Sequence, residues 1–307
     1  EYNHDKNVSL LGMPKEDDWI IHGPYSDKTL MRNYLAYKWS NDIGPYAVRC
    51  KFFELFYNDD GNDVSYEEDY WGVYILMERI EIDDNRVDIA ELTPEDNSEP
   101  EISGGYIFAK DKSSPGDITF NTSYLNLRYI EPAGDELTNE QKAYVINWFN
   151  QFENALDSSY FDDPEIGYQK YIDVNSFIDH MILIELCRNI DGYYLSTYMY
   201  KERNGKLHMG PIWDYNLSLG NANYRYGWEP EGWNRYGPHW YGRLLQDPEF
   251  RIKFWDRWYK HRRNELETNK LIQDIENTAA KLDEAQQRNF TRWNHLNTRL
   301  WPNPYVL

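Results

Sequence analysis

Apolar residues recur at helical spacing through the second half of the chain. Thr138 and Gln141 form a capping-box pattern, and apolar positions three and four residues apart follow it. Residues 175–188 are apolar on nearly every face, which predicts a buried central helix. Further helices are predicted over residues 248–265 and 269–297. This half of the chain is therefore predicted to be mainly helical.

The first third has shorter apolar runs, of the kind that form strands. Residues 48–57 and 71–80 are rich in Phe, Tyr, Val and Ile, and they flank a turn signal at residues 58–61. This pattern predicts an antiparallel hairpin with a long tip. Further short strands are predicted over residues 18–22 and 105–110.

A helix is predicted over residues 26–39, between the predicted strands at residues 18–22 and 48–57. Ser26 and Asp27 are both residue types that cap helix N-termini. Residues 93–101 are polar and predict a loop. The first third is therefore predicted to mix strands with one helix.

A second hairpin is predicted inside the helical half. Residues 197–201 and 207–212 read as strands, and the dipeptide Asn204-Gly205 between them is a strong signal for a tight hairpin turn. The predicted fold class is therefore α+β, with a β-rich N-terminal part and a helical C-terminal part that contains one hairpin.

Composition narrows the class of protein. Of the 307 residues, 41% are hydrophobic and 17% aromatic, which is enough for a large core. The 32 Lys and Arg residues face 52 Asp and Glu residues. Such an acidic surface repels nucleic acid and anionic lipid, and it makes divalent cations natural partners. No apolar run approaches the roughly 20 residues of a membrane span.

The two cysteines and the first residue bear on the compartment. Cys187 lies within the predicted buried helix, which favours a structural thiol. A disulfide between Cys187 and Cys50 is the alternative. The chain starts at Glu1, in a polar stretch and without an initiator Met, which indicates a processed protein or an excised domain. The sequence does not specify the oligomeric state.

Two aspartates flank the second hairpin. Asp191 follows directly after the buried helix, and Asp214 ends the last strand of the hairpin, 23 positions later. Protein kinases and small-molecule kinases use this order: a loop Asp accepts the hydroxyl proton, and a second Asp binds Mg²⁺. The alternative for Asp191 alone is an ordinary turn residue, and the alternative for Asp214 alone is an ordinary acid in a loop. Their joint placement around a hairpin favours catalysis.

At this point the sequence resembles the CotH kinases, atypical protein kinases first met as spore coat proteins. The resemblance runs over nearly the whole chain. It is carried by residues 10–19, by Gly23-Pro24-Tyr25-Ser26-Asp27-Lys28-Thr29 with Arg32-Asn33, by residues 72–78, by Gly104-Gly105-Tyr106, by Asn189-Ile190-Asp191-Gly192-Tyr193, and by Gly210-Pro211-Ile212-Trp213-Asp214 with Gly220-Asn221-Ala222.

The resemblance implies an atypical protein-kinase-like fold of two lobes, which we place at residues 1–137 and 138–307. It implies ATP and Mg²⁺ or Mn²⁺ as cofactors, with Ser or Thr hydroxyls of secreted, surface or spore coat proteins as acceptors. By the same resemblance, Asp191 matches the catalytic Asp of the family and Asp214 its metal-binding Asp.

The chain departs from protein kinases in its metal ligands. Ser196 stands five residues after Asp191, where protein kinases place a metal-binding Asn. Asn216 is expected to take that role, because an amide oxygen is an acceptable ligand for a hard cation.

The residues that would bind the phosphates of ATP are also atypical. No Gly-rich phosphate loop is present, and His22 stands where the strand should carry the phosphate-binding Lys. That lysine lies upstream of Glu1, or else Lys28, Arg32 or Lys110 substitutes for it. A solvated surface charge is the alternative for each of the three.

Three further expectations concern the surroundings of the site. A nucleotide-binding hinge is expected at Met77 and Glu78, with a plain core strand and residues 129–132 as alternatives. His180, on the buried helix, either braces the catalytic loop or is a hydrogen-bonded core residue. The aromatic residues of the irregular stretch 221–241 suit an activation segment, a substrate platform or core packing; they are Tyr224, Tyr226, Trp228, Trp233, Trp240 and Tyr241.

The leading hypothesis is a protein kinase of the extracellular space, cell surface or spore coat. A surface binding protein on a kinase-like scaffold, for adhesion or carbohydrate contact, is the first alternative. A small-molecule phosphotransferase is the second, since it would share the acid pair.

Overall fold

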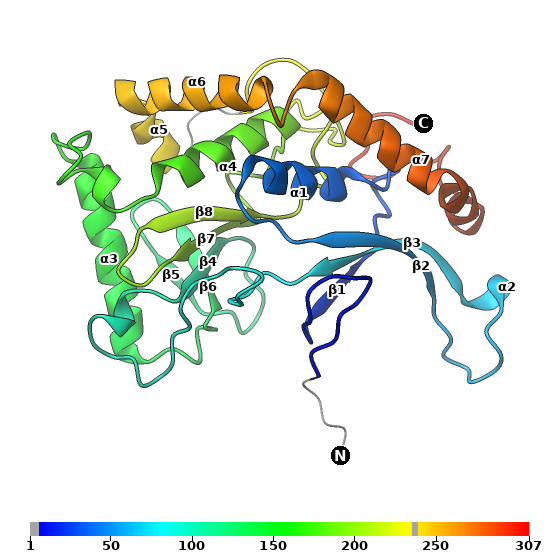
Figure 1. Ribbon diagram of the computed structural model, residues 1–307, viewed down its shortest axis with the longest axis horizontal. Helices are drawn as coiled ribbons and strands as arrows, with labels where there is room; N and C mark the ends of the chain where they lie inside the picture. Colours follow the sequence, from blue (N-terminus) through cyan, green and yellow to red (C-terminus); the bar gives the residue numbers. More distant parts are fainter. Residues whose placement is uncertain (1–5, 235–238, 307) are drawn as a thin grey trace.

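The computed structural model describes residues 6–234 and 239–306. Within them, strands form two antiparallel sheets, and the seven α-helices lie mainly on one side of these sheets, the upper side in Figure 1. The smaller sheet has the order β1 (Trp19–His22), β3 (Tyr70–Glu78), β2 (Cys50–Phe56). The larger sheet has the order β5 (Thr119–Asn121), β6 (Asn126–Glu131), β4 (Tyr106–Lys110), β7 (Thr197–Lys201), β8 (Leu207–Ile212). The prediction of a mixed α and β fold is confirmed.

Both predicted hairpins are present. β2 pairs with β3 from Cys50 opposite Met77 outward, and the tip between them carries the short helix α2 (Tyr66–Asp69). β7 pairs with β8, and Asn204 takes the left-handed conformation (φ 54°) that the tight turn requires.

The predicted helices of the second half are also present. The capping box of Thr138 and Gln141 forms and opens α3 (Asn139–Asp157). α4 (Val174–Cys187) is the buried central helix. The other two predicted helices are α6 (Pro248–Arg262) and α7 (Thr268–Arg292), whereas the short helix α5 (Trp240–Leu244) was not predicted.

The first helix begins later than predicted. α1 runs over Arg32–Ile43, because Leu30 takes the left-handed conformation (φ 63°) and keeps residues 26–31 out of the helix. The N-cap of α1 is Met31, whose side chain makes no capping hydrogen bond, so the prediction of Ser26 or Asp27 as the cap is wrong. The Asp27 carboxylate accepts the backbone N–H groups of Thr29 at 3.1 Å and Arg32 at 2.8 Å.

Two strands of the larger sheet were not predicted. β5 is three residues long, and β6 mixes polar and apolar positions in the sequence NLRYIE. Because they are short and weakly patterned, pairing stabilises them more than their own propensity does: β6 pairs with β4, and β5 pairs with β6. β4 in turn pairs with β7, so this sheet joins strands from both sides of residue 137.

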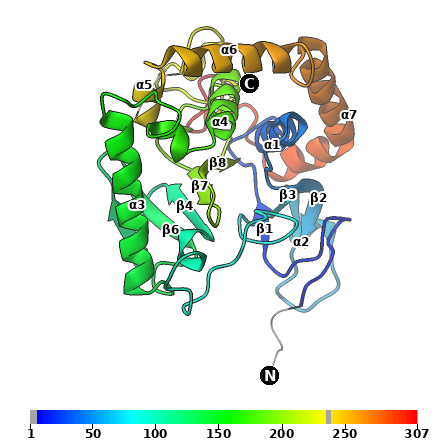
Figure 2. The same cartoon turned by 60° about the vertical axis from the view of Figure 1, so that its left-hand side comes forward.

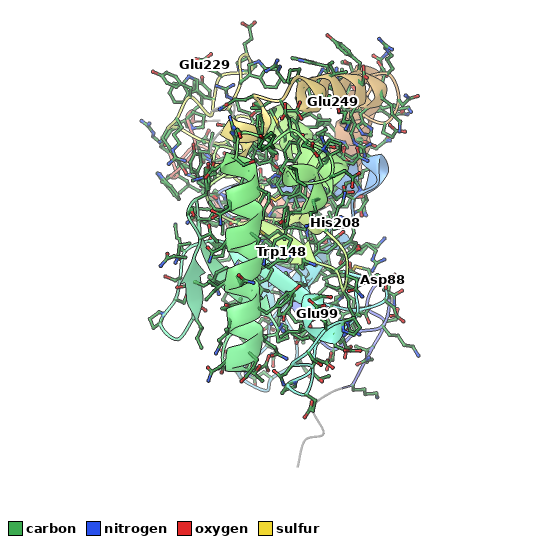
Figure 3. The ribbon with its side chains drawn as sticks, turned by 90° about the vertical axis from the view of Figure 1, so that its left-hand side faces the viewer. Asp88, Glu99, Trp148, His208, Glu229 and Glu249 are labelled. Carbon is green, nitrogen blue, oxygen red and sulfur yellow. The ribbon has the colours of Figure 1, made fainter. Side chains whose placement is uncertain are left out.

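The helices link the two sheets into one body. α3 lies along the larger sheet, where Phe149 packs edge-on against Phe108 of β4, and Trp148 faces the Lys201 ammonium of β7 at 5.2 Å (Figures 2 and 3). α7 packs on the smaller sheet, and the Asn289 side chain accepts the backbone N–H of Val73 at 2.9 Å.

The core and the cysteines agree with the sequence pattern. Cys187 is fully buried in α4, and both it and Cys50 are free thiols. Burial raises the pKa of the Cys187 thiol to about 12, so it stays protonated. Among the described residues, no helix is both long and apolar enough to cross a membrane.

Candidate active site

Asp191 lies in a loop that begins where α4 ends. Arg188 takes the left-handed conformation (φ 49°, ψ 50°), which terminates the helix. The Asn189 side chain accepts the backbone N–H of Asp191 at 3.2 Å. The Asp191 carbonyl accepts the backbone N–H groups of Tyr194 at 2.7 Å and Leu195 at 2.9 Å. These bonds at both ends of its peptide fix the backbone of Asp191.

Asp214 follows β8 in the left-handed conformation (φ 55°). Its backbone N–H donates to the Tyr37 hydroxyl at 3.0 Å, and the N–H of Tyr215 donates to the Asn33 side chain at 2.7 Å. Both acceptors belong to α1, which also packs against α4. Helix α1 therefore holds the loop that carries Asp214.

Asp191 and Asp214 line one cavity of about 750 Å³, the acid cavity. Ser196 and Asn216, also predicted from the sequence, line the same cavity. The other lining residues are Ser26, Asp111, Lys112, Leu195, Trp213, Leu217, Asn223, Tyr224, Arg225 and Trp301. Lining residues thus come from both ends of the chain and from the segments that follow β4, α4 and β8.

The Asp214 carboxyl is largely shielded from water and is affected by the charges of two other carboxylates, Asp111 and Asp191. Burial, together with the negative charges of Asp111 and Asp191, raises the pKa of this carboxyl to about 6. The backbone N–H of Asn216 and the charge of Lys112 act in the opposite direction, toward a lower pKa. A cation placed beside Asp214 would relieve the repulsion among these three carboxylates.

Asp191 is flanked by two donors. The Tyr224 hydroxyl lies 3.4 Å from its Oδ2, and a guanidinium nitrogen of Arg225 lies 3.4 Å from its Oδ1. The guanidinium also lies 5.1 Å from the ring centroid of Tyr194. Both donors come from the irregular stretch after Asp214, so that stretch orients the Asp191 carboxylate.

The side-chain oxygen of Asn216, Oδ1, is buried and has no hydrogen-bond partner within the described ranges. A buried acceptor left unpaired costs free energy unless a ligand satisfies it. Nowhere in the same ranges do three or more His, Cys, Asp or Glu side chains gather as a metal cluster. Any metal here would have few protein ligands, as Mg²⁺ commonly does at phosphate-binding sites.

Lys28 and Arg32 lie elsewhere, although both were expected to meet phosphate. The buried ammonium of Lys28 donates to the carbonyls of Leu296 at 2.7 Å and Thr298 at 2.8 Å. Arg32 pairs with Asp27 and donates to the Ser218 carbonyl at 3.1 Å. Both cations are therefore tied to backbone in the described structure.

Lys110 and His180 line a separate small cavity behind the hairpin. His180 is buried, with Nδ1 3.0 Å from the Tyr241 hydroxyl, and burial lowers the pKa of its imidazole to about 3. A hydrogen-bonded core histidine, one of the two alternatives, is thus what the geometry shows. Of the aromatic stretch, Tyr224 lines the acid cavity and Trp240 and Tyr241 are buried; residues 235–238 lie outside the described ranges.

Met77 and Glu78, the expected hinge, lie at the end of β3. The Glu78 carboxylate accepts hydrogen bonds from Arg49 at 2.7 Å and from Tyr46 at 2.9 Å. These are contacts within the smaller sheet and the segment beside it. Residues 129–132, the alternative hinge, include the end of β6. Neither segment lines the acid cavity as described above.

The sequence did not single out Asp111, Lys112, Arg225 or Trp301. Asp111 and Lys112 follow β4 directly, and pairing of β4 with β7 brings them near the loop that carries Asp191. The sequence signal available was the end of a predicted strand, but the pairing of that strand with residues 197–201 was not predicted. Trp301 lies far along the chain, and no local pattern connects it with the two aspartates.

Comparison with known protein families gives a match that covers nearly the whole chain. No curated protein matches it. Residues 1–303 match the family described as CotH kinase protein. The match includes every residue that lines the acid cavity. The chain therefore belongs to the CotH kinase family.

Proposed function

We propose that this protein is an ATP- and divalent-metal-dependent protein kinase that phosphorylates Ser or Thr hydroxyls of secreted, surface or spore coat proteins. One observation carries the proposal: Asp191, Asp214 and Asn216 line a single cavity that also contains two cationic side chains. Positioning and charge stabilisation are what phosphoryl transfer chiefly requires from a protein.

Asp214 and Asn216 are the residues that would hold Mg²⁺ or Mn²⁺. A carboxylate and an amide oxygen suit either cation, and the unpaired Oδ1 of Asn216 fits this role. When bound, the metal supplies positive charge that neutralises the phosphate oxygens of ATP during transfer. The raised pKa of Asp214 supports a cation beside it, because bound metal would stabilise the ionised carboxylate.

Asp191 would act as the base. It accepts the proton of the acceptor hydroxyl as that oxygen bonds to the γ-phosphorus and ADP leaves. Tyr224 and Arg225 position its carboxylate from two sides. Ser196, five residues further on, leaves room in the cavity where a larger side chain would narrow it.

Lys112 and Arg225 are the cavity's cations and would contact phosphate oxygens. In this proposal the segment before residue 138 supplies Lys112, and the segment after it supplies Asp191 and Asp214.

The test is transfer of labelled γ-phosphate to a Ser- and Thr-containing protein such as casein, with Mg²⁺ or Mn²⁺. Asp214→Asn should abolish transfer, and Asp191→Asn should lower it by about 10²- to 10⁴-fold. Asp256→Asn, an exposed acid on α6, is the matched control and should keep full activity.

Undiminished transfer in both cavity variants would contradict the proposal. Transfer to a small hydroxyl compound but not to protein would point to a small-molecule phosphotransferase. No transfer, together with thermal stabilisation by glycans but not by ATP and metal, would point to a surface binding protein.

A further inference from the structure

The segment after α7 returns to the N-terminal part of the chain and is fixed there. His295 stacks on Tyr25 with ring centroids 4.5 Å apart, and its Nε2 lies 3.1 Å from the Tyr25 carbonyl. Lys28 binds two carbonyls of the same segment, those of Leu296 and Thr298. Because Lys28 is buried, its ammonium depends on these carbonyls for its hydrogen bonds, and they hold the segment firmly.

Asn303 ties the same segment to the loop that carries Asn216. Its side chain is buried and donates to the Ser26 carbonyl at 2.8 Å and to the Asn221 side chain at 2.7 Å. The Asn221 amide in turn donates to the Asn216 carbonyl at 2.9 Å. The end of the chain is therefore built into the cavity rather than merely lying near it.

Trp301 lies between these anchors and lines the cavity. Its side chain is 70% exposed, yet it stacks on Tyr224 with centroids 6.2 Å apart and an interplanar angle of 10°. Tyr224 in turn places its hydroxyl 3.4 Å from Asp191. The two rings thus form a flat aromatic surface that extends from the base to solvent.

This surface adjoins the base rather than the metal ligands. Tyr224 contacts Asp191, to which the acceptor hydroxyl must come, whereas Asp214 and Asn216 are held from α1 and from Asn221. An acceptor hydroxyl bound at Asp191 would lie beside Tyr224, on the aromatic surface that includes Trp301.

We propose that Trp301, stacked on Tyr224, is a specificity-determining residue for the acceptor polypeptide. It takes a large aromatic or aliphatic side chain within about three residues of the acceptor hydroxyl, a reach set by roughly 3.3 Å per residue of extended chain. This inference rests on the proposed function.

The physical basis is the burial of an exposed indole. A ring or branched aliphatic group laid on Trp301 removes apolar surface from water, and a ring adds an aromatic pair contact. The anchors at Lys28 and Asn303 hold Trp301 in place before the acceptor arrives, so little ordering is left to oppose binding.

The test uses synthetic Ser peptides that differ only in carrying Phe or Gly at one of the three positions on either side of the Ser. The wild-type enzyme, with ATP and Mn²⁺, should prefer Phe over Gly by about tenfold in kcat/KM at one position or more. Trp301→Ala should reduce that preference to within about twofold, by raising the acceptor KM, and Trp301→Phe should retain part of it.

Tyr305→Ala is the matched control. Tyr305 is 62% exposed in the same segment but is not among the residues that line the cavity, so this variant should keep the preference. An unchanged preference in Trp301→Ala overturns the inference, and so does a wild type that transfers phosphate without any preference. A raised KM for ATP in Trp301→Ala would place the aromatic surface on the nucleotide instead and also overturns it. Absence of both transfer and metal-dependent ATP hydrolysis in the wild type overturns the proposed function, and the inference with it.

Discussion

The hydroxyl of Tyr37 accepts a hydrogen bond of 3.0 Å from the backbone N–H of Asp214. Tyr37 is buried in α1, and its ring also stacks on Trp213 with centroids 5.9 Å apart. One side chain thus fixes two successive residues at the end of β8. The position of the proposed metal ligand depends on a helix more than 170 residues earlier in the chain.

Tyr37→Phe is expected to destabilise the protein and to weaken metal binding. The change leaves the Asp214 N–H without its acceptor in a buried place, which costs about 1–3 kcal/mol. The free energy of unfolding in urea measures the first effect, and Mn²⁺ titration in the presence of a non-hydrolysable ATP analogue measures the second. Tyr34→Phe, one turn earlier on α1 and facing a different cavity, is the control and should change neither by much. Equal effects of the two substitutions would show that the Tyr37 hydroxyl has no special role.

The unpaired oxygen of Asn216 leads to a prediction about metal affinity. Asn216→Leu removes that oxygen and should weaken Mn²⁺ binding about tenfold, whereas Asn216→Asp adds a charged ligand and should strengthen it. Isothermal titration with the same ATP analogue gives both affinities. Asn223 lines the same cavity and has been given no ligand role, so Asn223→Leu should leave the affinity nearly unchanged. A loss of affinity in Asn223→Leu as large as in Asn216→Leu would contradict the assignment.

The elements around the two aspartates could be predicted because local patterns specify them. The capping box of Thr138, the apolar run of α4 and the Asn-Gly turn each act within a few residues, and each is present. The order of these elements was read from the same patterns, and the CotH resemblance, confirmed as a family match over residues 1–303, added the roles expected of the two aspartates. The cavity that Asp191 and Asp214 share follows from that order.

Lys112 and Trp301 could not be assigned to the cavity from the sequence, because long-range packing places them there. Lys112 reaches the cavity only through the pairing of β4 with β7, and Trp301 only through the anchors of the C-terminal segment. Lys28 is the opposite case, a candidate site residue that packing places elsewhere. Its sequence context suggested a free cation near the site, but burial and two carbonyl acceptors give it a structural contact instead. A lysine's sequence neighbours do not specify which of these environments it meets.

Lys112 and Lys110 therefore offer a matched test of phosphate binding. Lys112→Met should raise the KM for ATP about 10- to 100-fold, because a charge-assisted contact to phosphate is lost. It should also raise the pKa of the Asp214 carboxyl, whose pKa the Lys112 charge lowers. Lys110→Met changes the neighbouring lysine, which faces the separate cavity beside His180, and should leave the KM for ATP close to that of the wild type. Steady-state kinetics with varied ATP distinguishes the two, and a larger effect at Lys110 would contradict the assignment of Lys112.

His180 makes the stability of the protein depend on pH. Its imidazole is buried, and the pKa of about 3 in the folded protein lies below the unfolded value of about 6.5. The unfolded chain therefore binds a proton more readily than the folded one. The neutral His180 contributes stability that is fully present above about pH 6.5 and is lost as the pH falls, by about 1.4 kcal/mol per pH unit.

The variant that isolates this effect is His180→Asn. Tyr241 donates its hydroxyl to the Phe177 carbonyl at 3.0 Å, so its oxygen accepts from Nδ1 of His180, and an Asn amide can donate in the same place without titrating. Other acids, such as Glu185 and Asp214, titrate alike in both proteins and cancel in the comparison. The free energy of unfolding in urea, wild type minus variant, should fall by about 2 kcal/mol between roughly pH 6.5 and pH 5. A difference that stays constant over that range would mean that His180 is protonated in the folded protein or reaches water there.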